Sequence, residues 1–358
     1  MKKLIFLLFL LLPIKVLAIS AQSSIVMDLD TGRILYENNI NEKHLIASIS
    51  KIMTAIVTIE MADLDKVVEV QDEVLEATGS AIYIEMGEKL TIRDLLYGLM
   101  LRSGNDAAMV IAKNVAGSME AFTMLMNEMA SKIGMQNTYF YNAHGLEESD
   151  GNGNISTAYD MALLTKYAMQ NAEFRKIFGT KNYQVKTNMK SYSWTSKNKL
   201  IHNYNFITGG KTGYTQKAKR TLVTTASSNN INLVIVTLND PNDFNDHISL
   251  YKDIFRKYEA VKVLDKDNIK IKNETQYVDD ILYTLEDIYV PVTKEEKNKL
   301  RIEYKLYNNK QYVDGDIVGE ASIYINDNLI HKENIYVMKK KETEKLSWWE
   351  KLLRWLKW

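Results

Sequence analysis

The chain has 358 residues, of which 46% are hydrophobic and 25% charged, and its formal net charge is zero. This is the composition of a globular protein with room for more than one domain, and it excludes a largely disordered chain. A neutral chain offers no basic field for nucleic acid, and the absence of cysteine excludes disulfides and thiolate metal sites.

The first 18 residues have the layout of a secretory signal. Lys2 and Lys3 precede a leucine-rich run at 4–12, and Val16-Leu17-Ala18 offers small or apolar residues for cleavage. The run is too short for a helix that spans a bilayer, and an uncleaved anchor is the alternative. We therefore expect residues 1–18 to be removed and the protein to work outside the cytoplasm.

Residues 19–258 predict an antiparallel sheet covered by helices. Two short strands joined by a turn come first, a block of helices follows, and strands return before a closing helix. This order is typical of the α+β class. Predicted helices cover 48–61, 91–101, 105–115, 119–133, 157–169 and 243–258. Predicted strands cover 24–28, 34–37, 181–187, 191–196, 207–214, 221–227 and 231–238.

The pattern changes after residue 258. Charged residues alternate with Ile, Val, Tyr and Leu, as in Leu300-Arg301-Ile302-Glu303-Tyr304, and Asp314-Gly315 is a turn signal. Period-two alternation between polar turns predicts a small all-β domain over 259–338. No catalytic constellation is found there, so we expect a spacer or an interaction platform.

Residues 339–358 predict an amphipathic helix that lies on a membrane. This segment has seven basic and three acidic residues. Tryptophan on an apolar face with basic residues opposite favours a membrane interface with anionic lipid, and docking on the protein's own surface is the alternative. The apolar face would comprise Trp348, Trp349, Leu352, Leu353, Trp355 and Leu356.

One motif that could carry chemistry is Ser48-x-x-Lys51, at the start of the first predicted helix. Positions i and i+3 share a helix face, so both side chains would point into the same space. A serine needs a base to take its proton, and a lysine can be that base when burial or a nearby cation lowers its pKa. The same spacing occurs at Ser196…Lys199 and Ser249…Lys252, so the spacing alone decides nothing.

Two further motifs complete a set for acyl transfer. Ser103-Gly104-Asn105 interrupts two predicted helices, and Lys211-Thr212-Gly213 lies on a predicted strand. The first adds a hydroxyl that can relay protons and an amide that can orient a peptide. The second adds a cation and a hydroxyl that can bind the C-terminal carboxylate of a peptide. Each has a plainer interpretation: Ser103-Gly104-Asn105 could be only a turn and a helix cap, and Lys211 could be a solvated strand end.

The three motifs, in this order, resemble those of the serine D-alanyl-D-alanine carboxypeptidases, the low-molecular-mass penicillin-binding proteins. Longer stretches around them are also similar to the family, and the resemblance covers roughly residues 22–258. The matching stretches are Asp28–Glu37, Ala47–Thr54, Met100–Ala108, His144-Gly145-Leu146 and Gly210–Thr215.

The resemblance implies a β-lactamase/transpeptidase-like catalytic domain, a small all-β domain and an amphipathic C-terminal helix. It implies removal of the terminal D-alanine from peptidoglycan stem pentapeptides through a serine acyl-enzyme, and acylation by β-lactams. No cofactor and no metal are expected. The implied partners are the stem peptide, β-lactam antibiotics and the membrane surface, at the outer face of the cytoplasmic membrane.

The resemblance also implies roles for single residues. Ser48 would be the nucleophile, Lys51 its base, and Ser103 a proton relay to the leaving D-alanine. Asn105 would hold the stem-peptide backbone, and the backbone N–H groups of Ser48 and Tyr214 would stabilise the oxyanion. The remaining substrate-binding residues would be Lys211, Thr212 and Gly213.

The sequence departs from the family pattern at a few positions. Ser50, Thr208 and Gly210 differ from the residues we would expect there, and Lys219-Arg220 replaces a stretch that usually contains glycine. A second cation for the carboxylate is commonly a basic residue shortly before the Lys-Thr-Gly strand, and Lys197 is the candidate.

Three other classes of protein were weighed. A β-lactamase needs a carboxylate that positions water, and Glu148…Asn152 has the spacing of that block but Gly151 where leucine is usual. A penicillin-binding sensor would acylate without turnover, but no transmembrane signalling segment is visible. A metallopeptidase would show paired histidines, and the five histidines have no His-Glu-x-x-His spacing.

Overall fold

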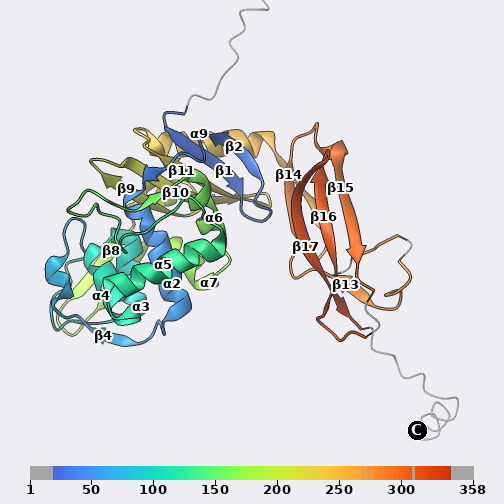
Figure 1. Ribbon diagram of the computed structural model, residues 1–358. Coiled ribbons are helices and arrows are strands. Elements are labelled where there is room, and N and C mark those ends of the chain that lie inside the picture. Colours follow the sequence, from blue (N-terminus) through green and yellow to red (C-terminus); the bar gives the residue numbers. More distant parts are fainter. Residues whose placement is uncertain (1–18, 268, 273, 309–310, 340–358) are drawn as a thin grey trace, which may run out of the picture. The chain divides into compact units, whose positions relative to one another are not determined.

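The computed structural model describes residues 19–339, apart from 268, 273 and 309–310, and the chain divides into two compact units at residues 259 and 260. The first unit is built on a five-stranded antiparallel sheet (Figure 1). In spatial order its strands are β2 (Ile34–Asn38), β1 (Ser23–Asp28), β11 (Ile231–Leu238), β10 (Lys219–Ser228) and β9 (Ile207–Thr215). The two ends of the unit thus meet in the sheet, and β9 lies at its edge.

Helices cover both faces of this sheet (Figure 1). On one face lies α9 (Asp243–Lys257), whose His247 ring is 2.7 Å from the Thr224 hydroxyl and 3.0 Å from that of Thr237. Burial of both faces explains why β11 is a nearly continuous apolar run and not an alternating one. The helices of the other face are α2 (Lys51–Met61), α3 (Ile92–Tyr97), α4 (Asn105–Ala116), α5 (Met119–Ile133), α6 (Ala158–Ala168) and α7 (Ala172–Phe178).

Helix α2 runs through the middle of this helical block. Every residue from Lys51 to Thr58 is buried, and Ile52, Met53 and Ile56 belong to the main hydrophobic core. A helix that is apolar on most sides is stable only when protein surrounds it. The packing around α2 therefore fixes the place of its first turn, where the Ser-x-x-Lys motif lies.

Several short elements were not predicted, because so few residues give too little periodicity to recognise a strand or a helix. These are the ribbon of β3 (His44–Leu45) with β6 (Ile155–Ser156), the ribbon of β4 (Val67–Glu69) with β5 (Lys89–Thr91), and the short helix α8 (Lys199–Asn203). The predicted hairpin is formed by β7 (Asn182–Lys186) and β8 (Ser191–Thr195).

The second unit contains only strands and one 3₁₀ turn, within its described residues, and confirms the predicted small β domain. Its buried core includes Val290, Ile323 and Val337, and it is separate from the core of the first unit. Its strands are β12 (Glu259–Leu264) paired with β14 (Ile288–Val292), and a four-stranded sheet ordered β13 (Ile281–Tyr283), β17 (Asn328–Met338), β16 (Ile317–Ile325) and β15 (Leu300–Leu306).

Two predicted segments fall on residues that the structure does not describe. The signal at 1–18 lies wholly outside the described residues, and so does the amphipathic tail apart from Lys339. In the part of the chain that is described, no helix has both the length and the apolar character needed to cross a membrane.

Candidate active site

Ser48 lies in a 3₁₀ turn, Ala47–Ser50, that leads directly into α2. We predicted an α-helix from Ser48 onward, and the first turn is instead tighter. The Ser50 hydroxyl donates to the Ala47 carbonyl at 2.7 Å, and the Thr221 hydroxyl of β10 donates to the Ile46 carbonyl at 3.0 Å. Ala47 has a positive φ of 50°, which is costly for a residue with a Cβ. The surrounding contacts thus hold Ser48 in one position.

Gly145 supports this turn from the loop before β6. Its φ is +88°, and a Cβ at this position would lie 2.1 Å from the Ala47 carbonyl oxygen and 3.1 Å from the Ser48 nitrogen. Only glycine lets the two backbones approach this closely. Position 145 of this loop therefore has to be glycine if Ser48 is to keep its position.

Gly145→Ala is expected to lower the free energy of unfolding by about 3 kcal/mol, because it adds both a clash and left-handed strain. Gly117→Ala is the matched control: its φ is +85°, but a Cβ there meets nothing within 4 Å, so only strain of about 1 kcal/mol is added. Urea unfolding of both variants checks this, and equal losses of stability would contradict it.

Lys51 is fully buried directly below Ser48. Its Nζ donates to Ser48 Oγ at 3.2 Å, to Asn105 Oδ1 at 2.7 Å and to the main-chain oxygen of His144. Within the described part of the chain, Lys51 forms no ion pair. A buried lysine without a carboxylate partner is strongly biased toward its neutral form.

The pKa of the Lys51 amine is lowered well below its usual 10.5, first by burial and then by the charges of Lys211 and Lys197. Asp106 acts in the opposite direction with a smaller effect. A neutral amine has a lone pair that can accept a proton, so Lys51 can act as a base toward the serine hydroxyl 3.2 Å away.

Ser103 lies at the break between two helices, as predicted. The chain widens to a π-helix at Gly98–Arg102 and then turns at Ser103, whose φ is +64° and ψ +35°. This left-handed residue ends one helix and directs its hydroxyl into the site, where it accepts a hydrogen bond from Lys211 Nζ at 3.0 Å. A π-turn followed by a strained residue is common at functional sites.

Neither Asn105 nor Asp106 caps α4 with its side chain. The N-cap is Gly104, and no side chain bonds there. Asn105 instead accepts from Lys51 and donates to the Thr78 carbonyl at 2.6 Å. Asp106 accepts from three backbone N–H groups at 82–84 and so fixes the loop beside the site.

Strand β9 forms the wall opposite α2. Lys211 is buried, and its Nζ lies 3.0 Å from Ser103 Oγ and 2.6 Å from its neighbour's carbonyl at Thr212. Burial lowers the pKa of Lys211 to about 7, and the charge of Lys197 contributes. A Cβ on Gly213 would lie 3.0 Å from the Ser48 nitrogen, so glycine lets the strand pass close to the nucleophile.

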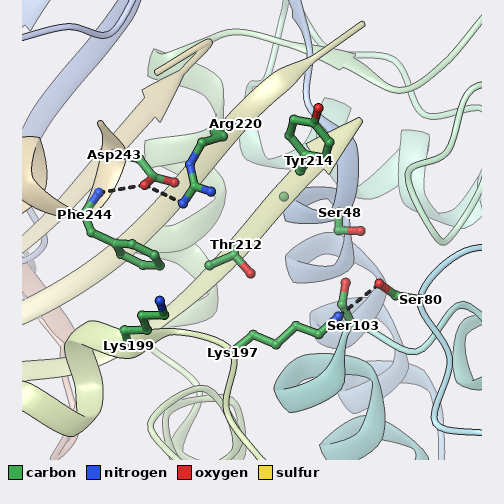
Figure 2. A pocket seen from close by; sticks show the side chains of 11 residues that line it. Ser48, Ser80, Ser103, Lys197, Lys199, Thr212, Tyr214, Arg220, Asp243 and Phe244 are labelled. Carbon is green, nitrogen blue, oxygen red and sulfur yellow. Dashed lines mark hydrogen bonds and ion pairs between the residues drawn. The ribbon is translucent and has the colours of Figure 1, made fainter. Parts of the chain in front are cut away.

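Ser48, Ser103 and Thr212 line one pocket of about 430 Å³, whereas Asn105 lines a different pocket and the buried Lys51 and Lys211 are not among the lining residues. Figure 2 shows Ser48 and Ser103 on one side, Thr212 and Tyr214 on the strand that faces them, and Lys197 below. The further lining residues are Ser80, Lys199, Gly213, Arg220, Asp243 and Phe244. The structure thus places all three motifs around the same space, together with several cations and few anions, which suits an anionic peptide substrate.

A sequence model described as D-alanyl-D-alanine carboxypeptidase matches residues 13–242. The chain belongs to the D-alanyl-D-alanine carboxypeptidase family. A second model, the C-terminal domain of penicillin-binding protein 5, matches residues 258–343. DacF of Bacillus subtilis is 33% identical over 307 residues, 82% of this chain and 78% of DacF. DacC of Escherichia coli is 30% identical over 348 residues, 91% and 85% of the two chains. Both relatives are named D-alanyl-D-alanine carboxypeptidases.

Solved structures of this carboxypeptidase family have the same fold. Penicillin-binding protein 5 from Haemophilus influenzae aligns over 90% of this chain and 98% of its own, with a TM-score of 0.71 and 23% identity. A D-alanyl-D-alanine carboxypeptidase from Mycobacterium tuberculosis covers 68% of this chain and 95% of its own, with a TM-score of 0.64 and 30% identity. The predicted transpeptidase-like fold with a C-terminal β domain is therefore confirmed.

The sequence did not predict some of the residues that line the pocket of this carboxypeptidase family member. Ser80, Lys199, Asp243 and Phe244 line it but belong to no motif. Arg220 was noticed only as a departure from the family pattern. The available signal for a role of Arg220 was its place on the strand that pairs with the Lys-Thr-Gly strand. The sequence could not indicate the ion pair that orients Arg220, because its partner Asp243 belongs to a separate element. The candidate cation Lys197 does line the pocket, and its Nζ donates to Ser80 Oγ at 3.0 Å.

Proposed function

We propose that the pocket beside Ser48 is where this protein, a serine-type D-alanyl-D-alanine carboxypeptidase, removes the terminal D-alanine from peptidoglycan stem peptides and is acylated by penicillin. Membership of the family supports the reaction. The observation that carries the assignment to Ser48 is the buried Lys51 amine 3.2 Å from its hydroxyl. Action on peptidoglycan outside the cytoplasm agrees with the cell-wall role of such enzymes.

In the first step, the neutral Lys51 amine takes the Ser48 proton as Oγ attacks the carbonyl carbon of the penultimate D-alanine. The C=O electron pair moves to oxygen, and the N–H groups of Ser48 and Tyr214 stabilise the oxyanion. Support comes from the close passage of β9 against the Ser48 nitrogen, which brings both backbones to one place.

In the second step, the electron pair of the oxyanion re-forms the C=O bond, the C–N bond breaks, and the amine of the leaving D-alanine takes up the proton that Lys51 received from Ser48. We assign the relay to Ser103, because its hydroxyl lines the same pocket and bonds Lys211. Lys211, Thr212 and Gly213 would hold the terminal carboxylate and let the peptide lie along β9, and Asn105 would orient the peptide backbone. Water then attacks the ester carbonyl as Lys51 takes its proton, and that proton passes to Ser48 Oγ as the C–O bond breaks, which returns both residues to their starting states.

The deciding experiment uses the protein with a diacetyl-Lys-D-Ala-D-Ala peptide. We expect D-alanine release that penicillin blocks and that a chelator leaves unchanged. Mass spectrometry of the penicillin-treated protein should place the adduct on the peptide that contains Ser48. An adduct on another serine would overturn the assignment of the nucleophile, and release that a chelator abolishes would overturn the reaction type.

We further propose that residues 1–18 are a removed export signal, that the catalytic domain spans 19–258 and the β domain 259–338, and that 339–358 anchor the protein to the membrane surface. Support for the anchor is the sequence pattern that would put tryptophan and leucine on one helix face and basic residues on the other.

Deletion of 339–358 is expected to abolish binding to vesicles that contain phosphatidylglycerol, since the apolar face and the basic residues would both be lost. Co-sedimentation at low and high salt measures this, and the full chain should bind less at high salt. Vesicles of phosphatidylcholine alone are the control. Equal binding by the truncated and full chains would contradict the anchor.

A further inference from the structure

A guanidinium group lines the pocket without a role in the chemistry described so far. Arg220 of β10 lies beyond Thr212, and Figure 2 shows its side chain pointing toward Thr212 and away from the serines. Its Nε is buried and, among the residues that the structure describes, has no hydrogen-bond partner. The side chain is 42% exposed overall, so part of it faces the open pocket.

Strand pairing explains why Arg220 lies near Thr212. In the antiparallel pair of β9 and β10, Arg220 is opposite Tyr214 and Leu222 is opposite Thr212. Side chains two apart on a strand share a face, so Arg220, Tyr214 and Thr212 all lie on the same face of the sheet. Diagonal neighbours of this kind are about 7 Å apart at Cβ, which a long arginine side chain bridges easily.

A buried carboxylate fixes the orientation of Arg220. Its Nη2 donates to Asp243 Oδ1 at 2.7 Å, and Asp243 is only 3% exposed at the start of α9. Asp243 also accepts from the Phe244 N–H at 2.8 Å, and the Phe244 ring lies 5.4 Å from the guanidinium carbon. One carboxylate oxygen and one ring thus hold the guanidinium flat and leave its other N–H groups free to point elsewhere.

We infer that Arg220 is a specificity-determining residue that binds the terminal carboxylate of the substrate together with Thr212. A carboxylate beside Thr212 would meet a planar donor that is already oriented, which is how arginine recognises carboxylates. Asp243 is a positioning residue that acts through Arg220. The inference rests on the proposed function, because it concerns the leaving end of the same peptide.

Lys211 is already assigned to this carboxylate, and Lys197 and Lys199 are further cations that line the pocket. For Lys197, the candidate from the sequence, the contacts favour Arg220 in its place. The Lys197 Nζ is bonded to Ser80 Oγ on the far side of the pocket, away from the Thr212 face. Its pKa is lowered by burial and by Arg102, which weakens its hold on an anion. The guanidinium of Arg220 offers a planar fork of donors that matches a carboxylate, which a lysine ammonium does not.

The test compares ligands with and without the carboxylate. Rates of acylation by benzylpenicillin and by its methyl ester are measured for wild type, Arg220→Ala, Arg220→Lys and Lys197→Ala. We expect Arg220→Ala to slow the acid about 10- to 100-fold and to leave the ester unchanged. Arg220→Lys should recover part of the loss, and Asp243→Asn should lose less than Arg220→Ala does.

Arg256→Ala is the matched control, because Arg256 is also ion-paired on α9 but is 81% exposed and lines no part of the pocket. Peptide turnover gives the second measurement: the loss in Arg220→Ala should lie mainly in KM. An unchanged ratio of acid to ester rates in Arg220→Ala, or a loss of that ratio only in Lys197→Ala, would overturn the inference. Neither result would touch the assignment of Ser48, which is tested separately by the site of the penicillin adduct on the wild-type protein.

Discussion

Replacing Ser48 by alanine is expected to abolish D-alanine release and labelling by penicillin. No other hydroxyl lies 3.2 Å from the Lys51 amine in the described structure, so no substitute nucleophile has a base. Loss of a catalytic nucleophile costs at least about 10⁴-fold in rate. The fold should survive, because Ser48 Oγ bonds only to Lys51 in the described part of the chain. Release of D-alanine and formation of the adduct are the two measurements.

Ser249→Ala is the matched control for this variant. Ser249 and Lys252 have the same spacing as Ser48 and Lys51, but they are exposed on α9, and the Lys252 amine lies near the Tyr204 ring. Activity should not change. A Ser48→Ala protein that still releases D-alanine at a rate near wild type would rule out Ser48 as the nucleophile, whatever its resemblance to the family.

The second expected result is a displaced pH profile in Lys211→Gln. In wild type, kcat/KM should rise with pH as Lys51 loses its proton, because only the neutral amine can accept one from Ser48. It should fall again as Lys211, whose pKa is about 7, loses the charge that would hold the carboxylate. The titrations of Lys51 and Lys211 are coupled, so the apparent pKa values of the acid and alkaline limbs describe the pair and not either residue alone.

In Lys211→Gln, the charge that helps to lower the Lys51 pKa is gone, so the Lys51 pKa rises. The acid limb should therefore move to higher pH, and the alkaline limb should disappear. Activity at the optimum will also drop, since the bond to Ser103 is lost. Lys252→Gln, an exposed lysine on α9, serves as the control. An acid limb that stays in place would show that the Lys211 charge does not act on the base.

Much of the catalytic unit follows from local sequence patterns. Helix α5 begins and ends where apolar periodicity predicts, at Met119 and Ile133, and β11 covers the predicted run. The three motifs were also predicted to share a site, and the structure brings them around one pocket. Such predictions succeed because periodicity, turn residues and short motifs act over a few residues, where sequence carries the information.

What sequence could not supply are contacts between distant segments. The His144 carbonyl that accepts from Lys51 lies 93 residues along the chain, and its main-chain oxygen carries no residue-type signal. The left-handed Ser103 depends on the π-helix before it, which no periodicity indicates. Arg220 lacks a motif altogether, and only the register with β9 and the carboxylate of Asp243 give it a place in the site.

The two separate hydrophobic cores have a consequence for how the protein melts. Each unit can lose its own packing without the other, so the whole chain need not unfold in one cooperative transition. The residues that line the pocket beside Ser48 all belong to the first unit, and a ligand stabilises the part that binds it. Calorimetry of the penicillin-treated chain should then show one heat-absorption peak displaced upward while the peak of the β domain stays where it was.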